Sequence, residues 1–198
     1  MKVNEFIEKA LKVEKMPTLY KLGKFMNSYQ QGKRKKYLLC DCSGLIKGIL
    51  WGYPENGHVG NHGVPDINAN TMIKYYCTNV SSDFSKIEKG ELVWLDGHIG
   101  IYVGNHQVCE CSPRLENGIQ ITTLSQRKWK KHGKFKYIDY STSNNHINNS
   151  SSVDINKVVD DVINGKYGNG HDIRRKAIEK LGLNYDEVRK LVNKKIKG

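Results

Sequence analysis

Cys42 is the residue of this sequence whose position best suits a nucleophile. It follows Asp41 and precedes Ser43, and an apolar stripe with helical spacing begins directly after it at Leu45. This pattern predicts that Cys42 lies at the N-terminus of a helix capped by Asp41 or Ser43. Unpaired N–H groups and the positive end of the helix dipole stabilise a thiolate at such a position. Because a free cysteine is most often a small buried hydrophobe, position alone leaves both roles open.

Two expected strands supply a base and a carboxylate. If residues 104–106 form a three-residue hairpin loop, Gly100 faces Glu110. Side chains alternate along a strand, so His98 and Glu110 share one face, with Glu110 diagonally opposite and within reach of a long side chain. A histidine beside an orienting carboxylate is what acid–base catalysis needs. The alternative is a His and a Glu on a solvated sheet face, and a loop one residue shorter would move Glu110 to the wrong face.

The cysteines also raise the question of a zinc site. Cys40 and Cys42 form one close pair, and Cys109 and Cys111 form another, each with a single residue between its members. Structural zinc sites usually leave about two to four residues between such ligands. Strand alternation also places Cys109 and Cys111 on the apolar face, away from His98. We therefore expect no metal and no cofactor, and the odd count of five cysteines argues against a disulfide scaffold.

The elements that position these residues fill residues 1–140. An amphipathic helical stripe over residues 3–11 ends before Pro17. A second helix is expected over residues 45–50. From Glu91 onward the pattern changes to four strands separated by turn residues. Helices followed by an antiparallel meander predict an α+β domain.

The chain changes character at residues 141–152, which are almost entirely Ser and Asn. Such side chains compete for backbone hydrogen bonds and bury little, so we expect a flexible linker. Residues 153–198 carry apolar residues at helical spacing and predict a small three-helix bundle, which has room to bind a ligand rather than to form a catalytic cleft. The expected stripes are Ile155, Val158, Val159, Val162 and Ile163; Ile173, Ala177, Ile178 and Leu181; and Val188, Leu191, Val192 and Ile196.

Composition limits the classes of protein. Hydrophobic residues make up 38% of the 198, which excludes wholesale disorder. No apolar run approaches the roughly 20 residues of a membrane span, and the N-terminus lacks a signal-peptide core, so we expect a cytoplasmic location. The net charge of +12 favours a polyanionic partner. The densest basic cluster, residues 33–36, has no interleaved aromatic residues, which favours a solvated loop over a nucleic-acid site.

Two motifs in the first part carry a family resemblance. Residues 41–45 read Asp-Cys-Ser-Gly-Leu and precede an apolar helix, and residues 97–102 read Gly-His-Ile-Gly-Ile-Tyr. Together they resemble the NlpC-type cysteine peptidases of the papain-like superfamily, over roughly residues 1–140. That family hydrolyses amide bonds in peptidoglycan stem peptides. The resemblance implies a papain-like α+β fold with helices packed on an antiparallel sheet.

The resemblance also implies roles for individual residues. Cys42 is the expected nucleophile, His98 the base, and Glu110 the polar residue that orients the base. Tyr20 matches the family's tyrosine near the nucleophile, with a buried core tyrosine as the alternative. The insertion at residues 51–64 is expected to line the cleft. Backbone N–H groups at the helix start, including that of Cys42, are expected to stabilise the oxyanion.

The C-terminal part resembles a wall-binding repeat of the Cpl-seven type, a three-helix bundle that recognises the muropeptide unit. Residues 165–170 read Gly-Lys-Tyr-Gly-Asn-Gly, and Leu-Gly-Leu-Asn-Tyr follows at 181–185. Tyr167 stands where the repeat usually has tryptophan, and loop packing and solvated charge are the alternatives for it and for the arginines. The wall contacts that the resemblance implies are Tyr167, Asn169, Asp172, Arg174, Arg175 and Leu181.

Together the two parts predict a phage endolysin, held in the host cytoplasm until lysis and acting on the Gram-positive wall. The expected partners are peptidoglycan and anionic wall polymers, and not nucleic acid. Stem-peptide endopeptidase is the leading expectation, and N-acetylmuramoyl-L-alanine amidase is the alternative. A non-enzymatic protein that binds the wall or a polyanion is the competing hypothesis. The linker would add avidity, since a bound module raises the local concentration of substrate.

Overall fold

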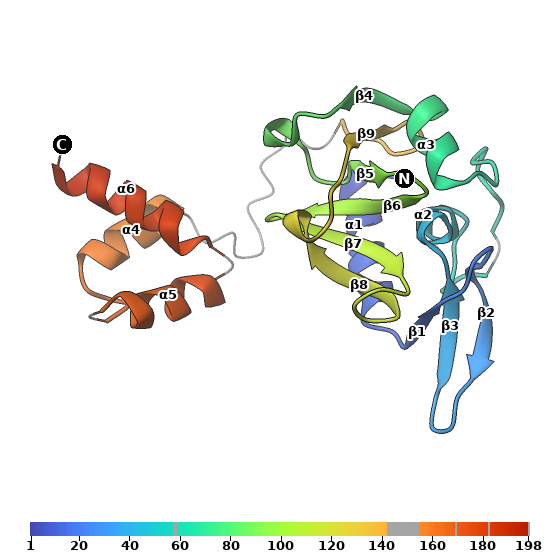
Figure 1. The fold of residues 1–198 in the computed structure, drawn as a ribbon, viewed down its shortest axis with the longest axis horizontal. Coiled ribbons are helices and arrows are strands. Elements are labelled where there is room, and N and C mark those ends of the chain that lie inside the picture. Colours follow the sequence, from blue (N-terminus) through green and yellow to red (C-terminus); the bar gives the residue numbers. More distant parts are fainter. Residues whose placement is uncertain (58, 142–154, 169, 182, 198) are drawn as a thin grey trace. The chain divides into compact units, whose positions relative to one another are not determined.

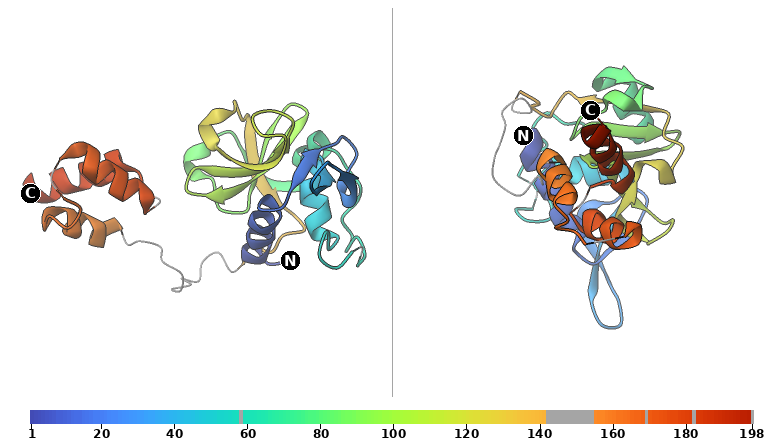
Figure 2. Two further views of the ribbon diagram at one scale, coloured as in Figure 1. Left: turned by 90° about the horizontal axis from the view of Figure 1, so that it is seen from below. Right: turned by 90° about the vertical axis from the view of Figure 1, so that its left-hand side faces the viewer.

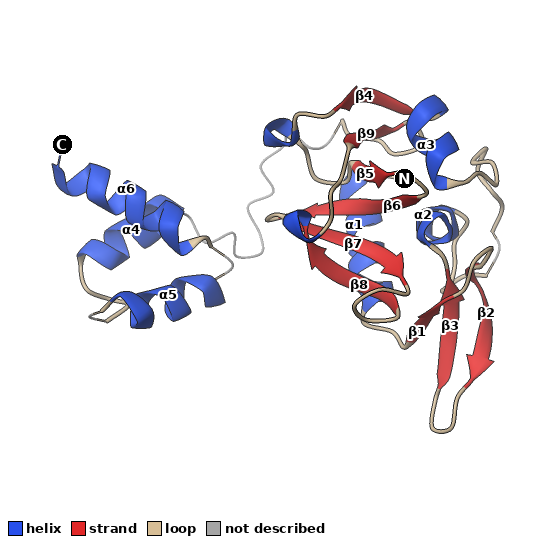
Figure 3. Ribbon diagram, viewed as in Figure 1, coloured by secondary structure: helices blue, strands red, loops and turns tan. Residues whose placement is uncertain are grey.

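The computed structural model shows two compact units, Met1–Asn145 and His146–Gly198 (Figure 1). The first is α+β and the second is helical, as expected (Figure 3). The expected linker, residues 141–152, lies outside the described residues except for Ser141. The structure describes residues 1–57, 59–141, 155–168, 170–181 and 183–197.

The first unit contains helices, strands and short 3₁₀ turns. Its helices and turns are α1 (Val3–Glu14), α2 (Cys42–Leu50), α3 (Ala69–Tyr75), η1 (Phe84–Lys86) and η2 (Leu124–Gln126). Its strands are β1 (Thr18–Tyr20), β2 (Phe25–Gln31), β3 (Lys36–Cys40), β4 (Cys77–Ser81), β5 (Leu92–Leu95), β6 (His98–Gly104), β7 (Gln107–Ser112), β8 (Gly118–Thr123) and β9 (Lys131–Phe135).

The main sheet has six antiparallel strands in the order β4-β9-β5-β6-β7-β8. The expected meander forms β5 to β8, and the two expected helices form α1 and α2. The periodicity did not predict β9, which inserts between β4 and β5, or the smaller sheet β1-β3-β2, in which β1 runs parallel to β3. These strands are short, and polar residues or glycine interrupt their hydrophobic alternation.

The main core lies between one face of the large sheet and the helices α1 and α2 (Figure 2). Strand alternation directs apolar side chains of β6 and β7 into this core, and each is fully buried. They are Ile99, Ile101, Cys109 and Cys111. The opposite face carries a smaller cluster around Val93, Tyr102 and Val108. His98 and Glu110 belong to this second face, as the alternation predicted.

The hairpin between β6 and β7 differs from expectation at its turn. Asn105 and His106 form a two-residue connection with positive φ angles of 51° and 57°, and Gly104 pairs with Gln107. The expected three-residue loop is therefore wrong, because the connection has two residues. A register shift between Tyr102 and Gly104 adds one residue to β6, so Gly100 still faces Glu110. The bulge compensates for the shorter turn and keeps Glu110 on the face of His98.

The second unit contains the three expected helices, α4 (Ile155–Ile163), α5 (His171–Lys180) and α6 (Tyr185–Lys197). The core residues of the expected stripes that the structure buries are Val158, Val159, Val162, Ile178, Val188 and Val192. Three expected core residues are instead exposed: Ile163 by 42%, Ile173 by 59% and Ile196 by 65%. In so small a bundle, one narrow stripe on each helix fills the interior. Across the described parts of both units, no helix has the length and apolarity to cross a membrane.

Candidate active site

Asp41 fixes the helix N-terminus that carries Cys42. Its Oδ1 accepts hydrogen bonds from the backbone N–H of Gly44 at 2.6 Å and from the hydroxyl of Ser43 at 3.0 Å. Its Oδ2 accepts from the N–H of Gly23 at 2.7 Å. A Cβ at Gly44 would lie 2.0 Å from the carbonyl oxygen of Lys24, so glycine is required where α2 meets this neighbouring segment. The Asp-Cys-Ser-Gly sequence thus builds the helix start on which Cys42 is mounted.

The Cys42 thiol lies at the edge of the core, with a relative exposure of 7% for the residue. Its Sγ is 4.0 Å from the carbonyl oxygen of Gly97. Burial raises the pKa of Cys42 to about 11, and the Asp41 carboxylate adds to this, while hydrogen bonds from the backbone of Ile99 and Ser43 lower it. The helix start is expected to stabilise a thiolate, whereas burial and the Asp41 carboxylate act in the opposite direction, so a base has to remove the proton of the thiol.

His98 lies beside Cys42 along the chain path, because Cys42 contacts the backbone on both sides of it, at Gly97 and Ile99. The His98 Nε2 lies 2.5 Å from Oε2 of Glu110, which is fully buried. This pairing occupies Nε2, so Nδ1 is the ring nitrogen that Glu110 leaves available. The expected arrangement of a base with an orienting carboxylate is therefore present.

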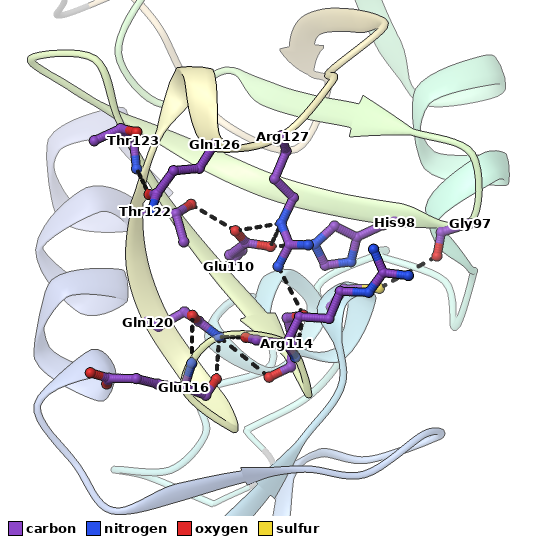
Figure 4. A network of polar contacts seen from close by, with 12 residues as sticks. Gly97, His98, Glu110, Arg114, Glu116, Gln120, Thr122, Thr123, Gln126 and Arg127 are labelled. Carbon is purple, nitrogen blue, oxygen red and sulfur yellow. Dashed lines mark hydrogen bonds and ion pairs between the residues drawn. The ribbon is translucent and has the colours of Figure 1, made fainter.

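Glu110 is held by more than His98 (Figure 4). The Nε of Arg127 donates to Oε1 at 2.8 Å and forms an ion pair with Oε2 at 2.7 Å, and Thr122 donates to Oε1 at 2.6 Å. The Nη2 of Arg127 also donates to the hydroxyl of Ser112 at 2.9 Å. Burial raises the pKa of Glu110, but the hydrogen bonds from His98, Arg127 and Thr122 outweigh it and hold the pKa below its usual value. Glu110 is thus an ionised carboxylate at neutral pH.

Two further residues fix the position of His98. Trp129 stacks on the imidazole, with ring centroids 5.6 Å apart and an interplanar angle of 16°. The Oδ1 of Asn70 accepts from the N–H of Gly97 at 2.9 Å and from the indole N–H of Trp94 at 2.9 Å, which anchors the turn before His98 to α3. His98 is therefore held at the ring edge by Glu110, at the ring face by Trp129 and through the adjacent backbone by Asn70.

Cavities open on both sides of this centre. One, of about 570 Å³, is lined by Cys42 and by residues of α2 and of the segment 66–70. The other, of about 600 Å³, is lined by His98 and by the loops after β7 and β8. Tyr20 and Gly97 line both cavities, so the two form adjoining halves of one cleft. The described residues of the insertion 51–64 line neither half of the cleft, contrary to expectation. Residues 66–70, which follow the insertion, line the half that contains Cys42.

Tyr20 ends β1 at the junction of the two halves, and its backbone N–H donates to Oδ1 of Asn117 at 2.9 Å. Burial, and then the nearby Cys42 sulfur, raises the pKa of the Tyr20 phenol. Tyr20 is therefore half-buried and reaches the cleft, which agrees with a place beside the nucleophile and not with a fully buried core tyrosine.

Three of the other cysteines belong to the core. Cys40, Cys109 and Cys111 are fully buried, and the thiols of Cys109 and Cys111 contact the carbonyl oxygens of Ala10 and Cys40, respectively. All five cysteines are free thiols. Within the described ranges, no group of three or more His, Cys, Asp or Glu side chains is arranged to hold a metal ion.

The expected wall contacts of the second unit are dispersed over its surface and loops. Arg174 lines a cavity of about 250 Å³ between α5 and α6, and its Nε donates to the carbonyl oxygen of Gly168 at 3.1 Å. Arg175 lies over the ring of Tyr185, 4.9 Å from its centroid. Asp172 is exposed in the first turn of α5.

Two of the remaining contacts, Tyr167 and Leu181, are half-buried against the core of the second unit. The Tyr167 hydroxyl also donates to Asp161 at 3.4 Å. Asn169 lies outside the described residues. The wall-binding role of these side chains stays a prediction.

Several residues of the site were not predicted from the sequence. Arg127 and Trp129 follow η2, which reverses the chain after β8 and is fixed by a capping box between Thr123 and Gln126. That Thr-x-x-Gln spacing is a sequence signal for a tight turn. Asn70 lies in the first turn of α3, which Asn68 caps, and no motif in the sequence distinguishes it from the other asparagines.

Both parts of the chain match known protein families. Residues 26–136 match the NlpC/P60 family, and residues 156–196 match the CW_7 repeat. The murein DD-endopeptidase MepH of Escherichia coli (strain K12) is 30% identical over 134 residues, which cover 64% of this chain and 45% of that protein. The chain thus matches less than half the length of this relative.

Two solved structures also show a distant similarity to the chain. The P60 domain of an antigen from M. avium paratuberculosis is 16% identical, with a TM-score of 0.46, and the match covers 67% of this chain and 91% of that one. The peptidoglycan hydrolase RipB from Mycobacterium tuberculosis is 14% identical, with a TM-score of 0.45, and the match covers 67% of this chain and 65% of that one.

Proposed function

The chain belongs to the NlpC/P60 family, and from the geometry around Cys42 we propose that it hydrolyses an amide bond in the stem peptide of peptidoglycan. The observation that carries the proposal is the contact of the Cys42 sulfur with the backbone on both sides of His98, whose Nε2 is bound to a buried carboxylate. A nucleophile, a base and an orienting group are thereby held at one point of a cleft.

The first step forms an acyl-enzyme. His98 takes the proton of Cys42, and the sulfur attacks the amide carbonyl. The first N–H groups of an α-helix have no intrahelical acceptor, so the N–H of Cys42 is free to donate to the oxyanion. As the C–N bond breaks, His98 gives its proton to the leaving amine. Glu110 holds the imidazole in place while it carries the positive charge.

The second step releases the product. His98 removes a proton from water, the resulting hydroxide attacks the thioester, and the thiol of Cys42 recovers its proton as the acid product leaves. Tyr20 lines both halves of the cleft, which supports a contact with the substrate at the scissile bond. The reaction as written uses only water and groups of this chain.

We propose stem-peptide endopeptidase as the activity, which is supported by the match to a murein DD-endopeptidase. The amidase alternative has the same chemistry at a different bond. The CW_7 match in the second unit supports retention on the cell wall, and the net charge of +12 supports a contribution from anionic wall polymers. This combination of a hydrolase and a wall-binding repeat supports a role as a phage endolysin. Its location in the host before lysis is tested by fractionation of the producing cells.

The release of soluble fragments from purified Gram-positive peptidoglycan tests the activity. We expect release by the wild type and none by Cys42→Ala or His98→Ala. Cys77→Ala is the matched control, because Cys77 is a partly buried free thiol on β4, outside the cleft, and it should keep full activity. Equal release by Cys42→Ala and Cys77→Ala would overturn the proposal. Binding without release by the wild type would favour the non-enzymatic hypothesis.

A further inference from the structure

The two halves of the cleft differ in charge. In the half that contains Cys42, the buried Lys47 ammonium is paired with Asp66, and Asp41 is satisfied by hydrogen bonds from its neighbours. The half that contains His98 is lined by Arg114, Arg127 and Lys128 against one carboxylate, that of Asp96. An excess of positive charge is therefore found on one side of the centre only.

Arg114 and Lys128 are the cations of this half that remain available. The guanidinium of Arg127 already donates hydrogen bonds to Glu110 and Ser112. Neither the Arg114 guanidinium nor the Lys128 ammonium has a hydrogen-bond or ion-pair partner among the described residues. Figure 4 shows the Arg114 side chain extending toward the end of the site where Gly97 and His98 lie.

The loop that carries Arg114 is held in place. Gln120 is buried on β8, and its side-chain amide donates to the carbonyl oxygen of Arg114 at 3.0 Å and to that of Ser112 at 3.3 Å. It also donates to the carbonyl oxygen of Glu116, while the hydroxyl of Ser112 accepts from the N–H of Arg114 at 3.1 Å. One buried amide thus fixes the loop at several points, and the backbone of Arg114 is preorganised (Figure 4).

The chemistry decides which part of the substrate enters this half. The general acid must lie within hydrogen-bond distance of the leaving nitrogen, so the amine side of the scissile bond occupies the half beside His98. The acyl side then occupies the half beside Cys42. A group recognised by Arg114 therefore belongs to the amine product.

We propose that the half of the cleft beside His98 is an anion subsite, in which Arg114, with Lys128, binds a carboxylate on the amine side of the scissile bond. This inference rests on the proposed hydrolysis of stem peptides. The ligand is an amino acid whose leaving amine and free carboxylate are attached to the same carbon. A guanidinium suits this group because it can donate two parallel hydrogen bonds to a carboxylate. Bonds whose amine side lacks such a carboxylate are expected to be poor substrates.

Two synthetic stem-peptide substrates test the subsite. They differ only in whether the carboxylate beside the leaving amine is free or is a carboxamide. For the wild type we expect kcat/KM to be about 10-fold higher with the free carboxylate. This factor is small for a hydrogen bond between charged groups, because Arg114 is exposed to solvent, which weakens the interaction. In Arg114→Gln this preference should fall to about one, with little change on the carboxamide.

Two further variants separate binding from structure. Arg114→Lys should restore part of the preference. Arg34→Gln removes the same charge from the hairpin between β2 and β3, outside the cleft, and should keep the wild-type preference. Equal wild-type cleavage of both peptides would overturn the subsite and leave the proposed function standing. An equal loss on both peptides in Arg114→Gln would also overturn it. No cleavage of either peptide or of peptidoglycan by the wild type would overturn the proposed function and the subsite together.

Discussion

Arg127 offers a sensitive test of how the site is held together, because its hydrogen bonds go to Glu110 and Ser112 rather than to the thiol or the imidazole. Its Nε donates to Oε1 of Glu110 and forms an ion pair with Oε2, and its side chain is 10% exposed. Removing one partner of a buried ion pair costs about 3–5 kcal/mol. Since His98 and Thr122 keep their bonds to Glu110 and water can enter from the adjoining cavity, we expect Arg127→Ala to lower the free energy of unfolding by about 2–3 kcal/mol.

The same substitution should change the pH dependence of activity. Burial raises the pKa of Glu110, and the hydrogen bonds that include Arg127 lower it below its usual value. Without Arg127 the opposing effect of burial remains, so the pKa rises. Because only the ionised carboxylate orients the His98 imidazolium, the acidic limb of the pH–activity profile should move to higher pH. We expect kcat/KM at neutral pH to fall by about 10- to 100-fold, a part of what general acid–base catalysis contributes.

The effect on stability has a defined sign. A carboxylate whose pKa is lowered in the folded state stabilises the fold above its unfolded pKa, about 4.3 for Glu, and this contribution is lost as the pH falls through the folded pKa. In Arg127→Ala that contribution should shrink, so the variant and the wild type should differ less at low pH than at neutral pH. Arg127→Lys keeps the charge without the planar guanidinium and should lie between the two. Denaturant unfolding and kcat/KM measured across pH give both readouts, and an unchanged acidic limb with wild-type kcat/KM would refute the role of Arg127.

Other residues of the site give predictions of their own. Because the pKa of Cys42 is about 11, its alkylation rate should rise about 10-fold per pH unit from neutral pH toward that value, and peptide mapping that finds a plateau at mildly acidic pH would contradict this. Asn70→Ala should lower kcat/KM about 10-fold by releasing Gly97, whereas Asn70→Asp keeps the acceptor oxygen and should lose less; equal losses would argue against the anchor. Trp129→Ala should lower kcat/KM more than Trp129→Phe does, and the difference should correspond to the roughly 0.5–1.5 kcal/mol that an aromatic stack contributes. Equal kcat/KM values for the two variants would show that stacking on His98 is not needed.

Strand alternation and helix capping predicted the centre of the site from the sequence. Asp41 caps the helix of Cys42, and Glu110 shares a face with His98, because both depend on spacing within a few residues. The hairpin turn was wrong by one residue, and a bulge in β6 restored the register. Sequence periodicity does not predict such a bulge, because a bulge depends on backbone geometry.

The residues that support the site required the tertiary structure. Arg127 reaches Glu110 only because η2 reverses the chain, and Asn70 reaches Gly97 from a helix that the sequence did not indicate. The burial that raises the pKa of Cys42 was not visible in the sequence either, whereas its position at the start of a helix was. Long-range packing decides each of these properties.

Mass spectrometry of purified Gram-positive peptidoglycan, digested by the wild type with Cys42→Ala alongside, is the most direct test of whether Cys42 hydrolyses an amide bond of the stem peptide. We expect new amino groups on the diamino acid or cross-bridge of the stem peptide with the wild type only, whereas new amino groups on the alanine at the sugar junction would identify an amidase. No new termini beyond those found with Cys42→Ala would show that Cys42 does not cleave peptidoglycan.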